Sequence, residues 1–233
     1  MKYKRVTEGR FISRPNRFIA YVEIEGATET VHVKNTGRCR ELLVEGCRVY
    51  LSVSDNPLRK TKYDLIAVVK ERENLPPLLI NMDSQIPNDV CGEWLKKGLL
   101  FSKDAKIKRE YTYKSSRFDF YVEDGERKIF LEVKGCTLEN EGVASFPDAP
   151  TERGVKHIKE LISALEDGYE AYVFFVVQMQ GMSVMKPNDI THKAFGDALR
   201  EAHKSGVKIL AYECAVFPDE IVIDKEIRVN LDT

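Results

Sequence analysis

Long apolar runs are missing from this sequence, and no segment approaches the roughly 20 apolar residues that a membrane-spanning helix needs. The first residues, 1–6, also lack the apolar core of a secretory signal. The five cysteines are odd in number and widely spread, with neither a Cys-x-x-Cys pair nor the Cys/His spacing of a zinc site. These absences exclude a membrane span, a disulfide framework and a zinc finger, and they predict free thiols in the cytoplasm.

A strong net charge is also missing, because 36 Lys+Arg and 37 Asp+Glu leave a formal charge of −1. This balance argues against a polycation that binds nucleic acid over its whole surface. The charges are nevertheless divided unevenly: residues 1–85 carry 15 basic and 11 acidic residues, and residues 86–233 carry 21 and 26. A basic first part could meet phosphates, while acids in the second part hold a metal ion.

The chain has 43% hydrophobic and 31% charged residues, which is typical of a soluble globular protein, and 233 residues suffice for one large or two small domains. Short alternating segments in the first part predict a small barrel of five strands, at 18–24, 28–33, 48–53, 62–69 and 77–81. Helical and strand patterns alternate in the second part, with helices at 88–100, 152–165 and 190–203 and strands at 106–113, 169–177 and 207–214. This alternation predicts an α/β domain with a mixed sheet.

Two apolar segments on either side of the turn dipeptide Asp124-Gly125 predict a β-hairpin. Side chains alternate faces along a strand, so Glu132 and Lys134 share a face, and pairing around the turn places Asp119 beside Glu132. Charged groups on an otherwise apolar sheet are costly unless they are paired or hold a metal ion. The hairpin therefore predicts a cluster of two carboxylates and one ammonium group.

Two carboxylates suit a hard cation such as Mg²⁺ or Mn²⁺. The candidate metal ligands are Asp119, Glu132 and the Val133 carbonyl, and Lys134 is the candidate residue for positioning an attacking water. Asp119, Glu132 and Lys134 are the predicted catalytic residues. The alternative is a surface hairpin with an ordinary Glu/Lys pair, but the apolar residues between the charges indicate buried strands and favour a site.

The spacing Asp-x12-Glu-x-Lys resembles the motif of the PD-(D/E)XK nucleases. Several further motifs, from about Phe11 to Tyr212 and in the right order, closely resemble the sugar fermentation stimulation protein A (SfsA) family. These motifs are Arg14-Pro15-Asn16-Arg17-Phe18, Asn35-Thr36-Gly37-Arg38, Arg59-Lys60-Thr61 and the segment 145–157, which reads SFPDAPTERGVKH.

The SfsA resemblance implies an OB-like fold for the barrel, which is a known platform for nucleic acids. The predicted fold class is thus α/β (α+β overall): an OB-like five-stranded β-barrel in residues 1–84, then a PD-(D/E)XK nuclease-like mixed-sheet α/β domain in residues 85–233. Basic and polar residues in the turns of the barrel and near the motif are the predicted DNA contacts: Arg14, Asn16, Arg17, Asn35, Arg38, Arg59, Lys60, Arg117, Arg153 and His157. The alternative is a solvated rim and a solvated helix end.

Related nucleases often add a further acid to the metal site, and Glu110 or Glu93 could fill that role here, the alternative being that both lie on the surface. The leading hypothesis is a DNA-binding, Mg²⁺- or Mn²⁺-dependent nuclease in the cytoplasm. A homodimer would suit an enzyme that cuts both strands, although no residue demands one. The second hypothesis is a DNA-binding transcriptional regulator of sugar catabolism that has the fold and does not cut. Nothing in the residues points to sugar chemistry itself.

Overall fold

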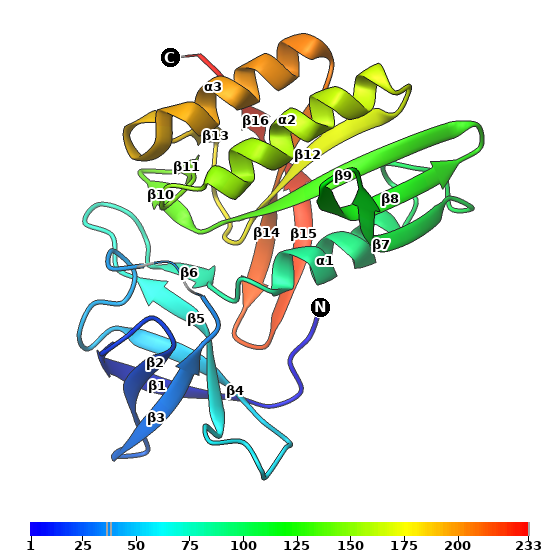
Figure 1. Ribbon diagram of the computed structural model, residues 1–233. Helices are drawn as coiled ribbons and strands as arrows, with labels where there is room; N and C mark the ends of the chain where they lie inside the picture. The colour runs from blue at the N-terminus through cyan, green and yellow to red at the C-terminus, as the bar shows by residue number, and fades with distance from the viewer. Residues whose placement is uncertain (36, 38, 233) are drawn as a thin grey trace. The chain divides into compact units, whose positions relative to one another are not determined.

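The computed structural model describes residues 1–35, 37 and 39–232 (Figure 1). The chain forms two compact units. The first is Met1–Ile86 with the later segments Gln178–Gln180 and Cys214–Val222, and the second is Pro87–Val177, Gly181–Glu213 and Ile223–Thr233. The predicted division between residues 84 and 85 does not include the two later segments of the first unit.

The first unit contains a closed barrel of β1 to β5, which is the predicted OB domain. Its strands are β1 (Val6–Ser13), β2 (Ile19–Ile24), β3 (Ala27–Val33), β4 (Arg48–Val53) and β5 (Tyr63–Lys70), and β6 (Leu78–Asn81) follows them. The hydrogen-bonded order is β3-β2-β1-β4-β5-β6, and a parallel pairing of β3 with β5 closes the ring. Alternate side chains such as Ala20, Val22 and Ile24 are buried inside it.

The sequence prediction differs from the structure in the first and in the last strand of the barrel. The prediction missed β1, because Glu8, Gly9 and Arg10 interrupt its apolar alternation and glycine disfavours strands. Gly9 is nevertheless needed there, since an added Cβ would come 2.5 Å from Cγ1 of Val22 on the neighbouring strand. The strand predicted at 77–81 is β6, which pairs with β5 outside the closed ring.

The second unit is built on a mixed sheet with the order β15-β14-β12-β9-β8-β7. Its strands are β7 (Lys106–Tyr113), β8 (Ser116–Asp124), β9 (Arg127–Cys136), β12 (Glu170–Val177), β14 (Lys208–Phe217) and β15 (Glu220–Glu226), of which β14 and β15 run on into the first unit. A smaller sheet has the order β10-β11-β13-β16, from β10 (Leu138–Asn140), β11 (Val143–Phe146), β13 (Val184–Pro187) and β16 (Arg228–Val229). The helices are α1 (Ile86–Leu95), α2 (Glu152–Glu166) and α3 (Asp189–Ser205).

Helices pack on both faces of the larger sheet, and the aromatic residues of β12 show which helix covers which face. Phe174 meets Trp94 of α1, with ring centroids 5.2 Å apart. Its neighbour Phe175 points the other way and contacts Phe146, which in turn packs on Phe195 of α3. Helices α2 and α3 lie side by side over this second face (Figure 1). Side chains alternate along β12, so one face of the sheet is covered by α1 and the opposite face by α2 and α3.

Candidate metal-dependent active site

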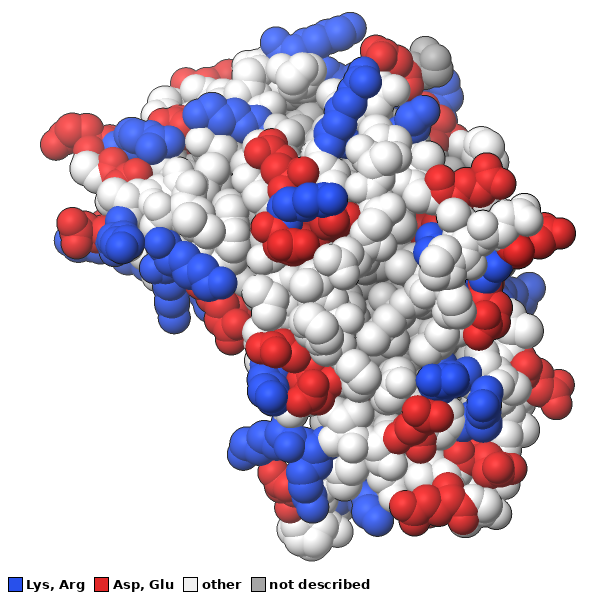
Figure 2. Space-filling view, turned by 180° about the vertical axis from the view of Figure 1, so that it is seen from behind, with Lys and Arg blue, Asp and Glu red and all other residues white. Residues whose placement is uncertain are grey.

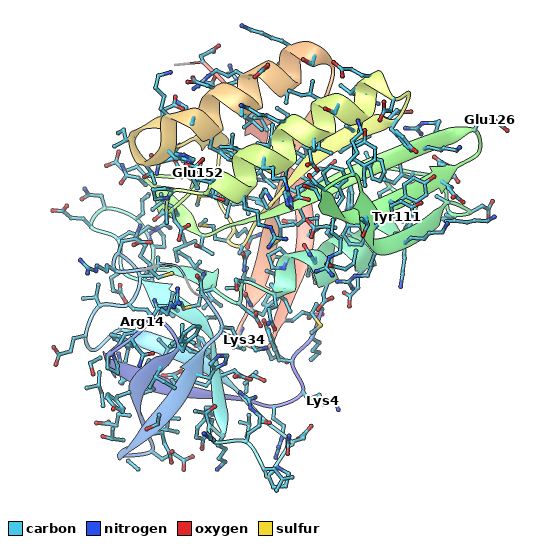
Figure 3. All side chains as sticks on the ribbon, viewed as in Figure 1. Lys4, Arg14, Lys34, Tyr111, Glu126 and Glu152 are labelled. Atoms are coloured by element: carbon cyan, nitrogen blue, oxygen red, sulfur yellow. The ribbon has the colours of Figure 1, made fainter. Side chains whose placement is uncertain are left out.

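The predicted hairpin is present as β8 and β9, which pair in antiparallel fashion from Asp124↔Arg127 to Phe120↔Leu131. The turn residues are Gly125 and Glu126, one position later than predicted, and Glu126 marks the tip in Figure 3. Gly125 has φ +63°, a conformation that glycine adopts without steric cost. The hairpin brings the two motif strands into one sheet, next to β12.

The hairpin ladder ends where the first predicted carboxylate lies. Phe118 faces the α2 side, with its ring centroid 6.1 Å from that of His157, whereas Phe120 faces Gly92 of α1. Residues two apart in a regular strand would face the same side, so the alternation of side chains along β8 is interrupted at Asp119. The backbone N–H of Val133 donates to Oδ2 of Asp119 over 2.7 Å, in place of a ladder bond.

Asp119 is held from two sides and its ionisation is disfavoured. Its Oδ1 accepts a hydrogen bond of 2.7 Å from Nδ2 of Asn88 on α1. Burial, followed by the negative charge of Glu132, raises the pKa of Asp119 to about 6, although the bonds from Val133 and Asn88 act in the opposite direction. A cation beside this carboxylate would relieve the repulsion that raises its pKa.

Glu132 is only 3% exposed and has an uneven set of partners. Its Oε1 accepts from Nζ of Lys134 over 2.5 Å and from Nδ1 of His157 over 2.6 Å. Burial acts to raise the pKa of Glu132, but the Lys134 charge and the contact with His157 outweigh burial, so the net pKa is lowered. Its Oε2 is buried and has no hydrogen-bond partner among the residues that the structure describes. An unpaired buried carboxylate oxygen is costly, and a cation would satisfy it.

His157 and Arg153 lie one turn apart on α2 and form a chain that leads to Glu132. Nε of Arg153 donates to Nε2 of His157 over 3.3 Å. An arginine nitrogen is always a donor, so Nε2 must accept, and the neutral ring carries its proton on Nδ1. That proton is donated to Glu132. Both ring nitrogens of His157 are thereby in use, so in this structure the ring orients Glu132 and has no free nitrogen for the predicted contact with DNA.

A divalent cation fits the residues at this site. Within the described part of the chain, no group of three or more His, Cys, Asp or Glu side chains is arranged to hold a metal. Mg²⁺ commonly takes only one or two protein carboxylates and keeps several waters, so the pair Asp119 and Glu132 is sufficient. The unpartnered oxygen of Glu132 and the raised pKa of Asp119 are both features that a bound cation would remove.

The additional acid expected from the sequence is not one of the neighbours found for Asp119. Glu110 pairs with Arg117, with Oε2 2.7 Å from Nε, and Glu93 is exposed on α1. The residue of α1 that reaches Asp119 is Asn88, an amide. Sequence reasoning missed Asn88 because it lies 31 residues upstream of Asp119, and an amide at a helix start carries no distinctive signal.

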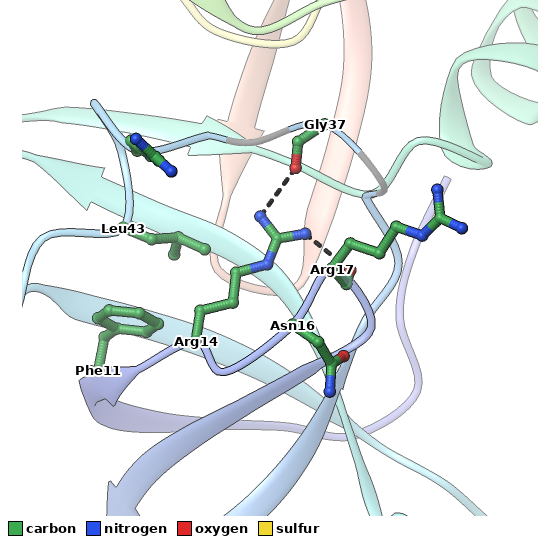
Figure 4. Close-up of a pocket in the computed structure, with 7 residues that line it drawn as sticks. Phe11, Arg14, Asn16, Arg17, Gly37 and Leu43 are labelled. Atoms are coloured by element: carbon green, nitrogen blue, oxygen red, sulfur yellow. Dashed lines mark hydrogen bonds between the residues drawn. The ribbon is translucent and has the colours of Figure 1, made fainter.

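Several predicted DNA contacts in the barrel have partners within the protein (Figure 4). The guanidinium of Arg14 donates to the carbonyls of Gly37, Arg17 and Asn35 over 2.6–2.8 Å. The side-chain oxygens of Asn16 and Asn35 accept from nearby backbone amides. These residues attach Asn35 and Gly37 to the loop 14–17 beside a pocket of about 340 Å³. The pocket is lined by Phe11, Arg14, Asn16, Arg17, Gly37, Arg40 and Leu43.

The remaining predicted contacts divide into paired and solvent-facing cations. Arg59 makes a bidentate pair with Asp64, at 2.6 and 2.7 Å, and is therefore already neutralised. Arg17 and Lys60 are exposed, and the Arg17 guanidinium lies 4.9 Å above the Phe18 ring. Arg38 lies outside the described residues. On the face drawn in Figure 2, positive and negative side chains are intermixed, so no single broad basic surface dominates it.

Comparisons with known proteins agree with this architecture. The family model described as the SfsA N-terminal OB domain matches residues 12–75, and the model described as the sugar fermentation stimulation protein RE domain matches residues 85–220. Two sugar fermentation stimulation protein homologs are similar over nearly their whole length. The relative from Ruminiclostridium cellulolyticum is 56% identical (99% of this chain, 100% of the relative), and that from Desulfitobacterium hafniense strain Y51 is 59% identical (99% of each).

A solved structure is also similar to the whole chain. It is Pyrococcus furiosus SfsA in complex with Ca²⁺, which is 28% identical and superposes with a TM-score of 0.85. The match covers 99% of this chain and 98% of the solved one. The shared architecture includes the N-terminal barrel and the mixed-sheet domain. In the part of the chain that the structure describes, no helix is both long and apolar enough to cross a membrane.

Proposed function

The chain belongs to the sugar fermentation stimulation protein family, and we propose that it is a DNA-binding, Mg²⁺- or Mn²⁺-dependent nuclease. The observation that carries this proposal is that Asp119, Glu132 and Lys134 lie together where the pairing of β8 with β9 ends. A protein that only binds DNA has no evident need for a buried carboxylate oxygen without a partner. The Pyrococcus furiosus relative is a complex with Ca²⁺, another hard cation that prefers oxygen ligands, which supports a cation site here.

Asp119, Glu132 and the Val133 carbonyl would hold the cation, which when bound polarises the scissile phosphate and lowers the pKa of a water. The remaining groups act by position and charge. Lys134 lies beside Glu132 with its side chain only 14% exposed, so it can orient the water or stabilise negative charge on the phosphate. His157 fixes the rotamer of Glu132 through the bond to Oε1, and Asn88 fixes Asp119. Exposed cations of the barrel such as Arg17 would contribute to the binding of DNA.

A cleavage assay with a matched lysine control tests the proposal. Labelled single- and double-stranded DNA and RNA are incubated with Mg²⁺, Mn²⁺ or EDTA, using wild type, Lys134→Ala and Lys128→Ala. Lys128 lies on the same strand and is exposed near the hairpin turn. We expect metal-dependent products from wild type and Lys128→Ala, and a rate lower by roughly 100-fold or more for Lys134→Ala, the scale of losing one charge-stabilising group.

The same assay separates the nuclease from the non-cutting regulator. Cleavage that persists equally in Lys134→Ala would come from a contaminant and would remove support for the site. DNA binding without products in every metal would favour the regulator, which the OB domain alone could serve, since that domain suggests nucleic-acid binding in general. Asp119→Ala and Glu132→Ala should abolish cleavage and leave the affinity for DNA nearly intact.

A further inference from the structure

A basic pocket of about 660 Å³ lies beside the candidate active site in the second unit. It is formed by the turn between β7 and β8 and by the first turns of α2, where Glu152 is labelled in Figure 3. The lining residues are Ser115, Ser116, Arg117, Glu152, Arg153, Lys156 and His157. His157 connects the pocket with the metal site, because its Nδ1 donates to Glu132.

The walls of the pocket are tied together before any ligand binds. Nζ of Lys156 donates to the backbone carbonyl of Ser115 over 3.1 Å, and Oγ of Ser115 donates to Glu160 over 2.6 Å. These two bonds attach the turn to α2. A preorganised site loses less entropy when a ligand binds.

The charges in the pocket favour an anion. Three cations line it, against the single carboxylate of Glu152, which is 85% exposed and pairs with His192. Lys156 lies 3.8 Å from Glu160, a loose contact, and Arg117 pairs with Glu110. Arg153 differs from both, since it has no carboxylate partner within the described part of the chain.

Arg153 is also oriented for an oxyanion. Its Nε is fixed by the bond to His157, and among the described residues no protein acceptor takes a hydrogen bond from its two terminal nitrogens. A planar guanidinium with two adjacent free nitrogens suits the bidentate binding of a phosphate. The exposed end of Arg153 therefore presents an unoccupied fork to the pocket.

We propose that this pocket binds a phosphate group of a nucleic-acid strand, adjacent to the phosphodiester at Asp119 and Glu132, with Arg153 as its principal contact. This inference rests on the proposed function, because it takes the ligand to be a nucleic acid. The phosphate is either a terminal monoester or an internal diester of the strand. Both present phosphate oxygens to the guanidinium. Oligonucleotides with and without a terminal phosphate distinguish the two cases.

Binding of short oligonucleotides tests the pocket without requiring cleavage. Fluorescence anisotropy is measured in EDTA with internally labelled single-stranded DNA that carries a 5′-phosphate, a 3′-phosphate or hydroxyls at both ends. The proteins are wild type, Arg153→Gln and Lys159→Gln. Lys159 is an exposed lysine of α2 outside the pocket, so its substitution makes the same change in net charge on the same helix.

We expect Arg153→Gln to weaken binding by about tenfold and to lower the log–log salt slope by roughly 0.7, the loss of one phosphate contact on a single strand. Lys159→Gln should bind like wild type. An internal phosphate predicts an equal loss for all three oligonucleotides. A terminal phosphate predicts tighter wild-type binding of one phosphorylated end, and this preference disappears in Arg153→Gln.

Failure of the pocket and failure of the nuclease give different results. Equal affinity of Arg153→Gln, Lys159→Gln and wild type overturns the pocket and leaves the cleavage result untouched. Binding that depends on Arg153, without cleavage in any metal, overturns the nuclease and keeps the pocket. If wild type binds none of the oligonucleotides, the pocket is overturned together with the DNA-binding part of the proposed function.

Discussion

Asp119 combines a raised pKa with a position in the candidate metal site, and this combination has a cost in stability. Its pKa is about 6 in the folded protein, against an ordinary value of 3.8. Because the folded pKa is the higher one, the protonated carboxyl stabilises the fold fully below pH 3.8, and this contribution is lost as the pH rises through about 6. The difference corresponds to about 3 kcal/mol, since one pKa unit is worth about 1.4 kcal/mol.

In the absence of metal, we therefore expect the change in the free energy of unfolding caused by Asp119→Asn to be more stabilising at pH 8 than at pH 4. The neutral amide avoids the charge that burial and Glu132 oppose. Thermal unfolding in EDTA at both pH values measures the effect, with Asp104→Asn as a control because Asp104 is exposed. Added Mg²⁺ should then stabilise wild type at pH 8 and have little effect on Asp119→Asn. An equal loss of stability at both pH values would contradict the assignment of the raised pKa.

The residues of the site differ in how far the sequence pattern predicts that they lie close together. The neighbours Asp119, Glu132 and Lys134 follow from strand alternation and the hairpin turn, which act over a few residues. The partners Asn88 and His157 do not, because they lie 31 and 25 residues away along the chain from the carboxylates that they contact. Their contacts depend on how α1 and α2 pack on the sheet, and no local pattern specifies that packing.

At the scale of elements, α2 is the support for the site. Oγ1 of its N-cap residue, Thr151, accepts a hydrogen bond of 3.1 Å from the backbone N–H of Gly154. We expect Thr151→Ala to lower the free energy of unfolding by about 1 kcal/mol, because it removes the cap. Thr151→Ser keeps the oxygen and should lose much less. Urea unfolding of the three proteins measures the difference, and equal losses in both variants would show that the hydroxyl does not act as the cap.

The elements that the sequence predicts well are those whose pattern is local and strong. The helix predicted at 152–165 is α2, Glu152–Glu166, and the strand predicted at 48–53 is β4, Arg48–Val53. The strands β10, β11, β13 and β16 were not predicted, because they have two to four residues each and too little alternation to be detected. The strand β15 was not predicted either, and it forms by pairing with β14.

At the scale of the whole molecule, the proposal assigns cleavage to the second unit and part of the DNA binding to the barrel, so the contribution of the barrel to binding should be separable from cleavage by mutation. Arg17 lines the pocket of the barrel and is exposed. Lys4 belongs to the same unit, is 87% exposed at its side chain, and lies away from Arg14 of the pocket in Figure 3. The two residues form a matched pair for charge reversal, one in the pocket and one outside it.

We expect Arg17→Glu to weaken DNA binding and to lower the salt slope by about one, because a phosphate contact is lost and its counterions are no longer released. Lys4→Glu should change both quantities little. At saturating DNA the cleavage rate of Arg17→Glu should equal that of wild type, since Asp119, Glu132 and Lys134 are unchanged. The measurements are anisotropy titrations at several salt concentrations and single-turnover cleavage. If Arg17→Glu binds DNA as Lys4→Glu does, the pocket of the barrel is not the binding surface, and the nucleic acid must reach the carboxylates through contacts in the second unit alone.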